Sequence, residues 1–184
     1  MQVVSLIPHP SSRPHRDVAV QVTVEAAGRG YALAYQVAGV SRLCIDGRGV
    51  GRTDELWRHT CFELFVRTVG ATAYREFNFA PTAAWAMYDF DDWRSGMRSP
   101  PVKHTPGVVD GRISGRKPTF GAYALYVTID AALLPQGPMI AAPTAVIEAI
   151  DGSKSYWAMA HPPGEPNFHH PACFALDLSP PTAA

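Results

Sequence analysis

Two neighbouring segments with period-two hydrophobicity place acidic and amide side chains where they could hold a polar ligand. Residues 60–67 include Glu63, and residues 74–79 include Glu76 and Asn78. Side chains alternate between the two faces of a strand, so Glu76 and Asn78 share a face. If the two segments pair as a hairpin, Glu63 joins them on that face. Carboxylates among aromatic residues need hydrogen-bond donors or a ligand, so this surface is a candidate binding site.

Two other roles remain open for these carboxylates. Arg58, Arg75 or Arg94 could pair with each of them, which would make them ordinary ion pairs. Glu63 and Glu76 could also serve as the acid and the base of a glycosidase, because those enzymes use two carboxyl groups. The separation of the two groups decides that chemistry, and nothing else in the sequence favours hydrolysis.

A histidine-rich segment offers a second set of candidate ligands. Residues 156–171 run from a predicted strand into a proline-rich loop that holds His161, His169 and His170. Zinc accepts imidazole ligands, but the spacing specifies no site, and His161 could instead close a hydrogen bond at the strand end. One of these histidines with a methionine could also form a haem axial pair. The methionines considered are Met87, Met97 and Met159.

The sequence has no recognisable catalytic motif. It contains no GxSxG, no HExxH and no phosphate-binding glycine loop. Residues 47–52 resemble a fragment of GxGxxG, but they lack the strand and helix that the dinucleotide motif requires and are predicted to be a loop. We therefore expect a non-catalytic protein that needs no cofactor.

The tryptophans favour a sugar as the ligand. Four tryptophans lie in the two polar-rich regions of the sequence or in the link of residues 89–94 between these regions. They are Trp57, Trp85, Trp93 and Trp157. A sugar has apolar C–H faces ringed by hydroxyls, so its receptor combines flat aromatic rings with carboxylate, amide and guanidinium groups. Each tryptophan could equally belong to the hydrophobic core.

Short strands are the elements that must position these residues. Turn-forming residues separate the period-two segments, and no apolar stripe with helical spacing lasts for three turns. This pattern predicts an all-β, antiparallel, jelly-roll-like sandwich of two sheets, as a single domain over residues 1–184 with frayed ends at 1–15 and 179–184. The predicted strands are residues 18–24, 31–37, 60–67, 74–79, 85–90, 123–129, 145–150, 156–160 and 173–178.

Composition and charge exclude several classes of protein. The 184 residues carry 16 Lys+Arg and 16 Asp+Glu, so there is no general attraction to nucleic acid or to an anionic membrane. No apolar run approaches the ~18 residues that span a bilayer. The odd number of cysteines, three, and the absence of a basic stretch before the first apolar run predict free thiols and a cytoplasmic location.

Several blocks resemble bacterial DOMON-like proteins, which are related to the family 9 carbohydrate-binding modules. The most specific blocks are Cys-Phe-Glu-Leu-Phe at 61–65 and Glu-Phe-Asn-Phe-Ala-Pro at 76–81. The resemblance spans residues 15–178 and implies a β-sandwich with a pocket for a sugar or, in other branches, haem. The sequence departs from the secreted members of this family, because it shows no visible export signal and no appended catalytic domain.

The resemblance also implies which side chains line the pocket. The expected ligand is a small-molecule sugar or sugar derivative, with a haem- or metal-binding electron-transfer domain as the alternative. The residues that it favours are Trp57, Glu63, Glu76, Asn78, Trp85 and Arg94, with Trp157 and His161 from the later strand.

Overall fold

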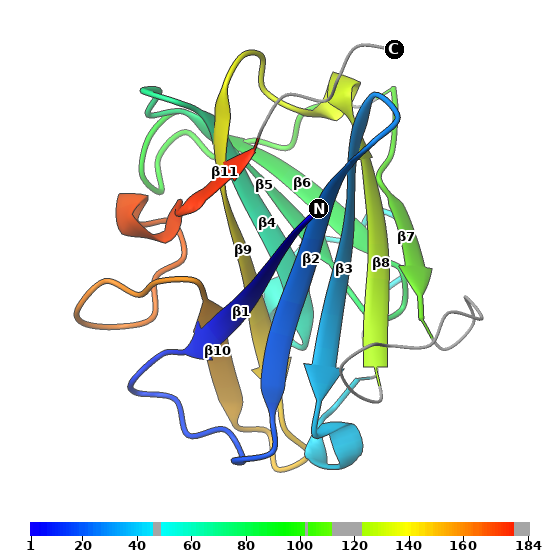
Figure 1. The fold of residues 1–184 in the computed structure, drawn as a ribbon, viewed down its shortest axis with the longest axis vertical. Helices are drawn as coiled ribbons and strands as arrows, with labels where there is room; N and C mark the ends of the chain where they lie inside the picture. Colours follow the sequence, from blue (N-terminus) through cyan, green and yellow to red (C-terminus); the bar gives the residue numbers. More distant parts are fainter. Residues whose placement is uncertain (46–48, 102, 112–122, 179–184) are drawn as a thin grey trace.

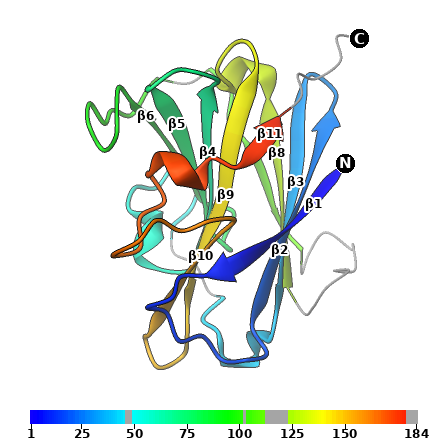
Figure 2. The same cartoon turned by 60° about the vertical axis from the view of Figure 1, so that its left-hand side comes forward.

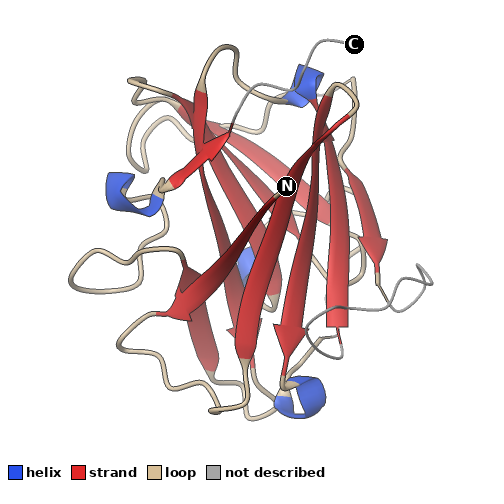
Figure 3. Cartoon of the chain, viewed as in Figure 1, coloured by secondary structure: helices blue, strands red, loops and turns tan. Residues whose placement is uncertain are grey.

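The described part of the chain, in this computed structural model, consists of strands joined by loops and four short 3₁₀ helices (Figures 1 and 3). It comprises residues 1–45, 49–101, 103–111 and 123–178. The strands are β1 (Gln2–Pro8), β2 (Ala19–Ala27), β3 (Gly30–Ala38), β4 (Cys61–Thr68), β5 (Tyr74–Phe79), β6 (Trp85–Phe90), β7 (Gly107–Asp110), β8 (Tyr123–Asp130), β9 (Met139–Glu148), β10 (Lys154–Ala158) and β11 (Leu176–Leu178). The 3₁₀ helices are η1 (Val40–Arg42), η2 (Leu56–Arg58), η3 (Ala131–Leu133) and η4 (Pro171–Cys173). Among these residues, no helix has the length and apolar character needed to cross a bilayer.

All strand pairs are antiparallel, as predicted, but the strands form one connected sheet. The order is β6-β5-β4-β9-β10-β1-β2-β3-β8-β7, and β11 pairs with β9 beyond the end of β10. The connection depends on β1, which pairs with β2 over most of its length and with β10 through Ile7 and Pro8. Figure 2 shows β1 crossing between the two halves of the sheet. The expected two-sheet sandwich is therefore corrected: a single antiparallel sheet curls until it nearly closes on itself.

The predicted strands correspond to β2–β6 and β8–β11, whereas β1 and β7 were not predicted. Residues 1–15 were expected to fray, but Gln2–Pro8 pair on both edges. The sequence of β1 is apolar at adjacent positions, and Val3 and Ile7 are exposed while Leu6 is buried, so no alternation marks it as a strand. The predicted fraying of 179–184 lies outside the described residues.

The sheet buries two hydrophobic clusters, one on each face of its β4–β5–β9 half. The larger cluster fills the interior between the two halves, with Tyr35 from β3 packed against Phe62 from β4. The smaller cluster lies on the outer face, around Phe65 and Tyr74. Residues 159–175 cover this outer face and contribute Phe168 and Phe174. Since both faces of β4 are covered, its residues Cys61 to Val66 are all buried.

A buried hydrogen bond links the two halves behind the polar residues of β4. The Tyr35 hydroxyl donates to the backbone carbonyl of Glu63 at 2.6 Å, and Tyr35 is completely buried. Tyr35→Phe should lower the free energy of unfolding by about 1 kcal/mol, because a buried acceptor loses its donor. Urea denaturation measures this change. Tyr156→Phe is the control, since that hydroxyl has no hydrogen-bond partner among the described residues; an equal loss in both variants would contradict the assignment.

Candidate functional site

The register of β4 and β5 brings the three predicted polar residues onto the outer face. Glu63 lies opposite Asn78, and Phe65 lies opposite Glu76. The prediction that Glu63, Glu76 and Asn78 share one face is confirmed. The two glutamates are diagonal neighbours on adjacent strands, so their carboxyl groups form one floor.

Neutral donors hold the two carboxyl groups. Asn78 Nδ2 donates to Glu76 Oε1 at 2.7 Å, and Thr144 Oγ1 donates to Glu63 Oε2 at 3.2 Å. The Cys61 thiol donates to Asn78 Oδ1 at 3.5 Å, which directs the amide NH₂ toward Glu76. Asn78 thus lies beneath the site and positions Glu76.

Arginine pairing does not explain these carboxyl groups. Arg75 forms a two-pronged ion pair with Asp89, and Arg58 pairs with Glu55. The Arg94 guanidinium lies close enough to influence Glu76 electrostatically, but the described residues show no ion pair between them within 4.0 Å. The carboxyl groups therefore retain capacity for another partner.

A short hydrogen-bond chain fixes the orientation and the tautomer of His169. The backbone N–H of Arg94 donates to the Tyr74 hydroxyl at 3.2 Å, and that hydroxyl lies 2.7 Å from His169 Nδ1. Among the described residues, Nδ1 is the only acceptor within reach of this buried hydroxyl, so we assign the hydroxyl proton to the bond with Nδ1 and, in the neutral ring, the imidazole hydrogen to Nε2. His169 Nε2 lies 4.0 Å from Glu76 Oε2. A donor and an acceptor face each other at a distance too long for a direct hydrogen bond.

These groups line a pocket of about 520 Å³ on the outer face. Aromatic side chains surround the carboxyl floor, and they come from η2, β4, β6, β10 and the segment after β10. The lining residues are Trp57, Arg58, Glu63, Phe65, Glu76, Phe90, Arg94, Met97, Val146, Lys154, Tyr156, Pro166, Phe168 and His169.

A larger cavity of about 730 Å³ lies elsewhere, beside η1 and the β9–β10 turn. Its charged side chains, such as Arg13, Arg42 and Asp151, are exposed, and it contains no buried titratable group. The smaller pocket is therefore the better candidate for specific recognition.

Burial changes the protonation of the pocket. It raises the pKa of Glu63 well above the usual range, with a further rise from the charge of Glu76. Burial also raises the pKa of Glu76 to about 7, although the Asn78 hydrogen bond and the Arg94 charge oppose the rise. The pKa of His169 is lowered to about 4 by burial and then by Arg94. The raised pKa favours the protonated form of Glu63, and at neutral pH Glu76 is partly ionised and His169 is neutral.

Four of the eight predicted residues line the pocket: Trp57, Glu63, Glu76 and Arg94. Trp85 and Trp157 instead belong to the interior core, because Trp85 pairs with Phe79 and Trp157 pairs with Ala145 on the inward face. These two predictions are corrected.

His161 also lies apart from the pocket lining. Its Nε2 is 2.9 Å from the carbonyl of Ile7, at the crossing strand β1. This is the structural role that the sequence left open for His161. The described residues contain no group of three or more His, Cys, Asp or Glu that could hold a metal ion.

Several lining residues were not among the predicted site residues. Tyr156 and Phe168 belong to the histidine-rich segment, and His169 was considered there only as a metal or haem ligand. Phe90 pairs with Tyr74, which lies on the same face of β5 as Glu76 because the two residues are two positions apart. Alternation along the two strands could therefore have assigned Phe90 to this face.

The comparisons with known proteins identify a similar fold. No protein-family model matches the chain, and no curated protein matches it. A solved structure from Bacteroides uniformis ATCC 8492, described as a "putative carbohydrate-binding protein", matches with a TM-score of 0.64 and 15% sequence identity. The match covers 92% of this chain and 83% of that protein. The arrangement of strands is thus shared, at an identity that shows only the fold.

The raised pKa of Glu76 predicts a pH-dependent effect of Glu76→Gln on stability. Unfolded Glu76 ionises near pH 4.5 and folded Glu76 near 7, so its contribution to stability falls as pH rises through that window. The lowered pKa of His169 acts in the opposite direction between about 4 and 6.5, which makes comparison with wild type necessary. The free energy of unfolding of the variant, relative to that of wild type, should therefore increase by on the order of 2 kcal/mol from pH 5 to pH 8.

Urea denaturation at the two pH values tests this prediction. Glu25→Gln is the control, because Glu25 is exposed on β2. An offset between Glu76→Gln and wild type that is the same at pH 5 and pH 8 would contradict it.

Proposed function

We propose that this protein binds a carbohydrate, or a small molecule containing a sugar, in the pocket above Glu63 and Glu76, without catalysing a reaction on it. The observation that carries the proposal is the 4.0 Å gap between Glu76 Oε2 and His169 Nε2. Two ~2.8 Å hydrogen bonds that meet at a right angle span ~4.0 Å. One hydroxyl group fits this gap, because it donates to the carboxyl oxygen and accepts from the imidazole N–H.

The remainder of the pocket provides the other contacts that a sugar needs. Trp57 and Tyr156 are half-buried rings, which leave apolar surface for C–H groups. Trp57 is held edge-on against Tyr88, whose hydroxyl donates to Asp54 at 2.7 Å. The structural likeness to the Bacteroides protein, described as carbohydrate-binding, supports the same ligand class.

Haem fits these residues less well. His169 and Met97 line the same pocket, as an axial pair would require. However, His169 Nδ1 is engaged by Tyr74 and Nε2 faces Glu76, so iron ligation would require the ring to give up one of these positions. A porphyrin bound here would also place its apolar face against the two buried carboxyl groups, which is unfavourable because that face offers them no hydrogen bonds.

Hydrolysis is also less favoured than binding. Glu63 and Glu76 supply two neighbouring carboxyl groups, but the solved structure with a similar fold is described as carbohydrate-binding and not as an enzyme.

A glycan array followed by calorimetry tests the proposal. Glu76→Gln should weaken binding of the sugar that is found by about 1.5–3 kcal/mol. In this variant, the oxygen of the new amide would still accept from Asn78 Nδ2, so the NH₂ group of the new amide would face His169. The ligand hydroxyl would then lose its acceptor at this position. Trp57→Ala should weaken binding by roughly 1 kcal/mol.

The exposed Glu25→Gln variant should bind as wild type does. The proposal fails if no sugar binds, or if Glu76→Gln binds every sugar as tightly as wild type. A Soret band in the purified protein would instead favour haem.

A further inference from the structure

We infer that a second sugar subsite lies against Trp93, so that the ligand is an oligosaccharide whose chain continues from the main pocket past Arg94. This inference rests on the proposed function and extends it from one sugar unit to at least two. It also gives a role to Trp93, which is not part of the main pocket lining.

The subsite is a groove of about 350 Å³ next to the main pocket. Arg94 and Pro166 line both, so the two spaces share a boundary. A molecule seated over Glu76 can therefore extend into the groove without leaving the surface. The groove is lined by Trp93, Arg94, Pro162, Pro163, Glu165, Pro166, Asn167 and His170.

Trp93 differs from the other tryptophans in its exposure. It is 52% exposed, whereas Trp85 is 7% and Trp157 is 3% exposed. Its ring lies perpendicular to that of His170, with the centroids 5.6 Å apart. This edge contact holds the indole and leaves ring surface uncovered, which is the arrangement that stacking of a sugar ring requires.

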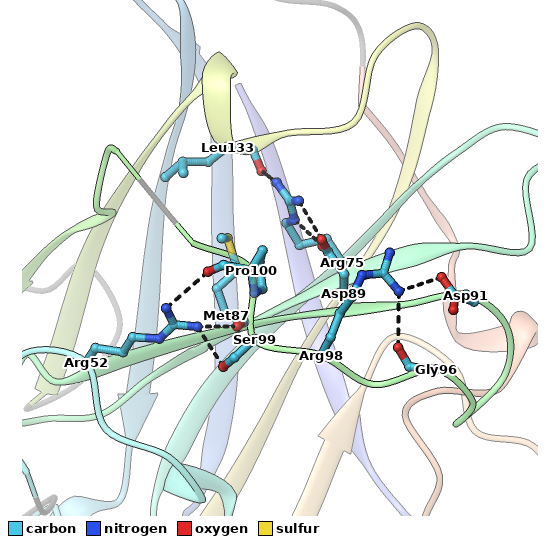
Figure 4. Close-up of polar contacts among 10 residues, drawn as sticks. All are labelled: Arg52, Arg75, Met87, Asp89, Asp91, Gly96, Arg98, Ser99, Pro100 and Leu133. Carbon is cyan, nitrogen blue, oxygen red and sulfur yellow. Dashed lines mark hydrogen bonds and ion pairs between the residues drawn. The ribbon is translucent and has the colours of Figure 1, made fainter.

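The loop that carries Trp93 is held in place before any ligand arrives. Arg98 Nη1 donates to Asp91 Oδ1 at 2.5 Å and to the carbonyl of Gly96 at 3.2 Å, and both bonds are drawn in Figure 4. Gly96 has a φ of 69°, and a Cβ there would lie 2.2 Å from Asp91 Oδ2, so a side chain at this position would strain the turn and displace Asp91.

The far end of the loop is held as firmly. Arg52 donates to Ser99 Oγ at 2.7 Å and to the carbonyls of Pro100 and Met87 (Figure 4). Arg75 pairs with Asp89 at the start of the loop and donates to the carbonyl of Leu133 at 2.6 Å. An aromatic side chain on a loop fixed at both ends loses little conformational entropy on binding.

The polar groups around Trp93 suit a second sugar unit. Glu165 and Asn167 also line the groove and add a carboxylate and an amide. The Arg94 side chain, between the two spaces, has no hydrogen bond or ion pair among the described residues, although its backbone N–H binds Tyr74. It can therefore donate to hydroxyl or ring oxygens where two units join.

Affinity as a function of chain length tests the inference. The probes are glucose, N-acetylglucosamine and xylose, with their β-1,4-linked disaccharides and tetrasaccharides, titrated by calorimetry. Wild type should bind the tetrasaccharide of its preferred sugar about tenfold more tightly than the monosaccharide, equivalent to ~1.4 kcal/mol. Trp93→Ala should remove this gain and leave monosaccharide affinity within about twofold.

Three further variants separate the two subsites. Trp57→Ala should weaken the monosaccharide and the tetrasaccharide alike, and Trp93→Phe should keep part of the gain. Val69→Ala, at a similarly exposed position in the β4–β5 turn, should change neither. The inference is overturned if wild type shows no gain with length, or if Trp93→Ala keeps the full gain while monosaccharide binding persists. If none of the nine sugars binds wild type, the inference of a second subsite is overturned, whereas the proposed function fails only if the glycan array also finds no sugar.

Discussion

The burial of two carboxyl groups on the outer face of β4 and β5 is the constraint on which this half of the molecule depends. Glu63 and Glu76 are 3% and 5% exposed and have no arginine partner within the described residues. Removing such groups from water is costly unless donors replace the lost hydration. Asn78 and Thr144 provide those donors from the same and the adjacent strand. Segments far apart in the sequence exclude the water, and the same segments supply the rings, the imidazole and the guanidinium of the pocket. The segments that shield the two carboxyl groups from water are therefore the segments that form the pocket.

Local pattern was sufficient to predict the strands and the polar face. Glu76 and Asn78 are two residues apart on one strand, and a short turn brings Glu63 beside them, so this face depends only on alternation and one hairpin. Alternation also explains the errors. Trp85 and Trp157 have the opposite parity to the residues that line the pocket, but parity across separate strands requires their register, which the sequence does not contain. The single connected sheet escaped prediction for a related reason: β1 pairs with β10 through two residues, and no composition signal marks such a crossing.

His169 shows where sequence reasoning reaches its limit. It lies 95 residues from Tyr74 in the sequence, yet the Tyr74 hydroxyl sets its tautomer. The same hydroxyl accepts from the backbone of Arg94, a non-glycine residue with a φ of 50° at the edge of the loop. The protonation of the pocket thus depends on a backbone conformation in one loop, a ring in a strand and an imidazole in a distant segment. The histidines were recognisable as candidates, but only tertiary contacts distinguish His169 from His161, which lies at β1.

The protonation of the pocket bears on the kind of ligand that it can hold. A metal cation bound by both carboxyl groups would need both of them ionised, and burial together with their mutual repulsion opposes this for Glu63. The raised pKa of Glu63 instead favours its protonated form, which can donate, and Glu76, with a pKa of about 7, is partly ionised at neutral pH and accepts. The neutral His169 adds an N–H donor, because burial and Arg94 keep its pKa near 4. A mixed set of donors and acceptors with little net charge matches groups that both donate and accept. Hydroxyl groups have that property, so the donors and acceptors of this pocket are chemically suited to a polyhydroxylated ligand.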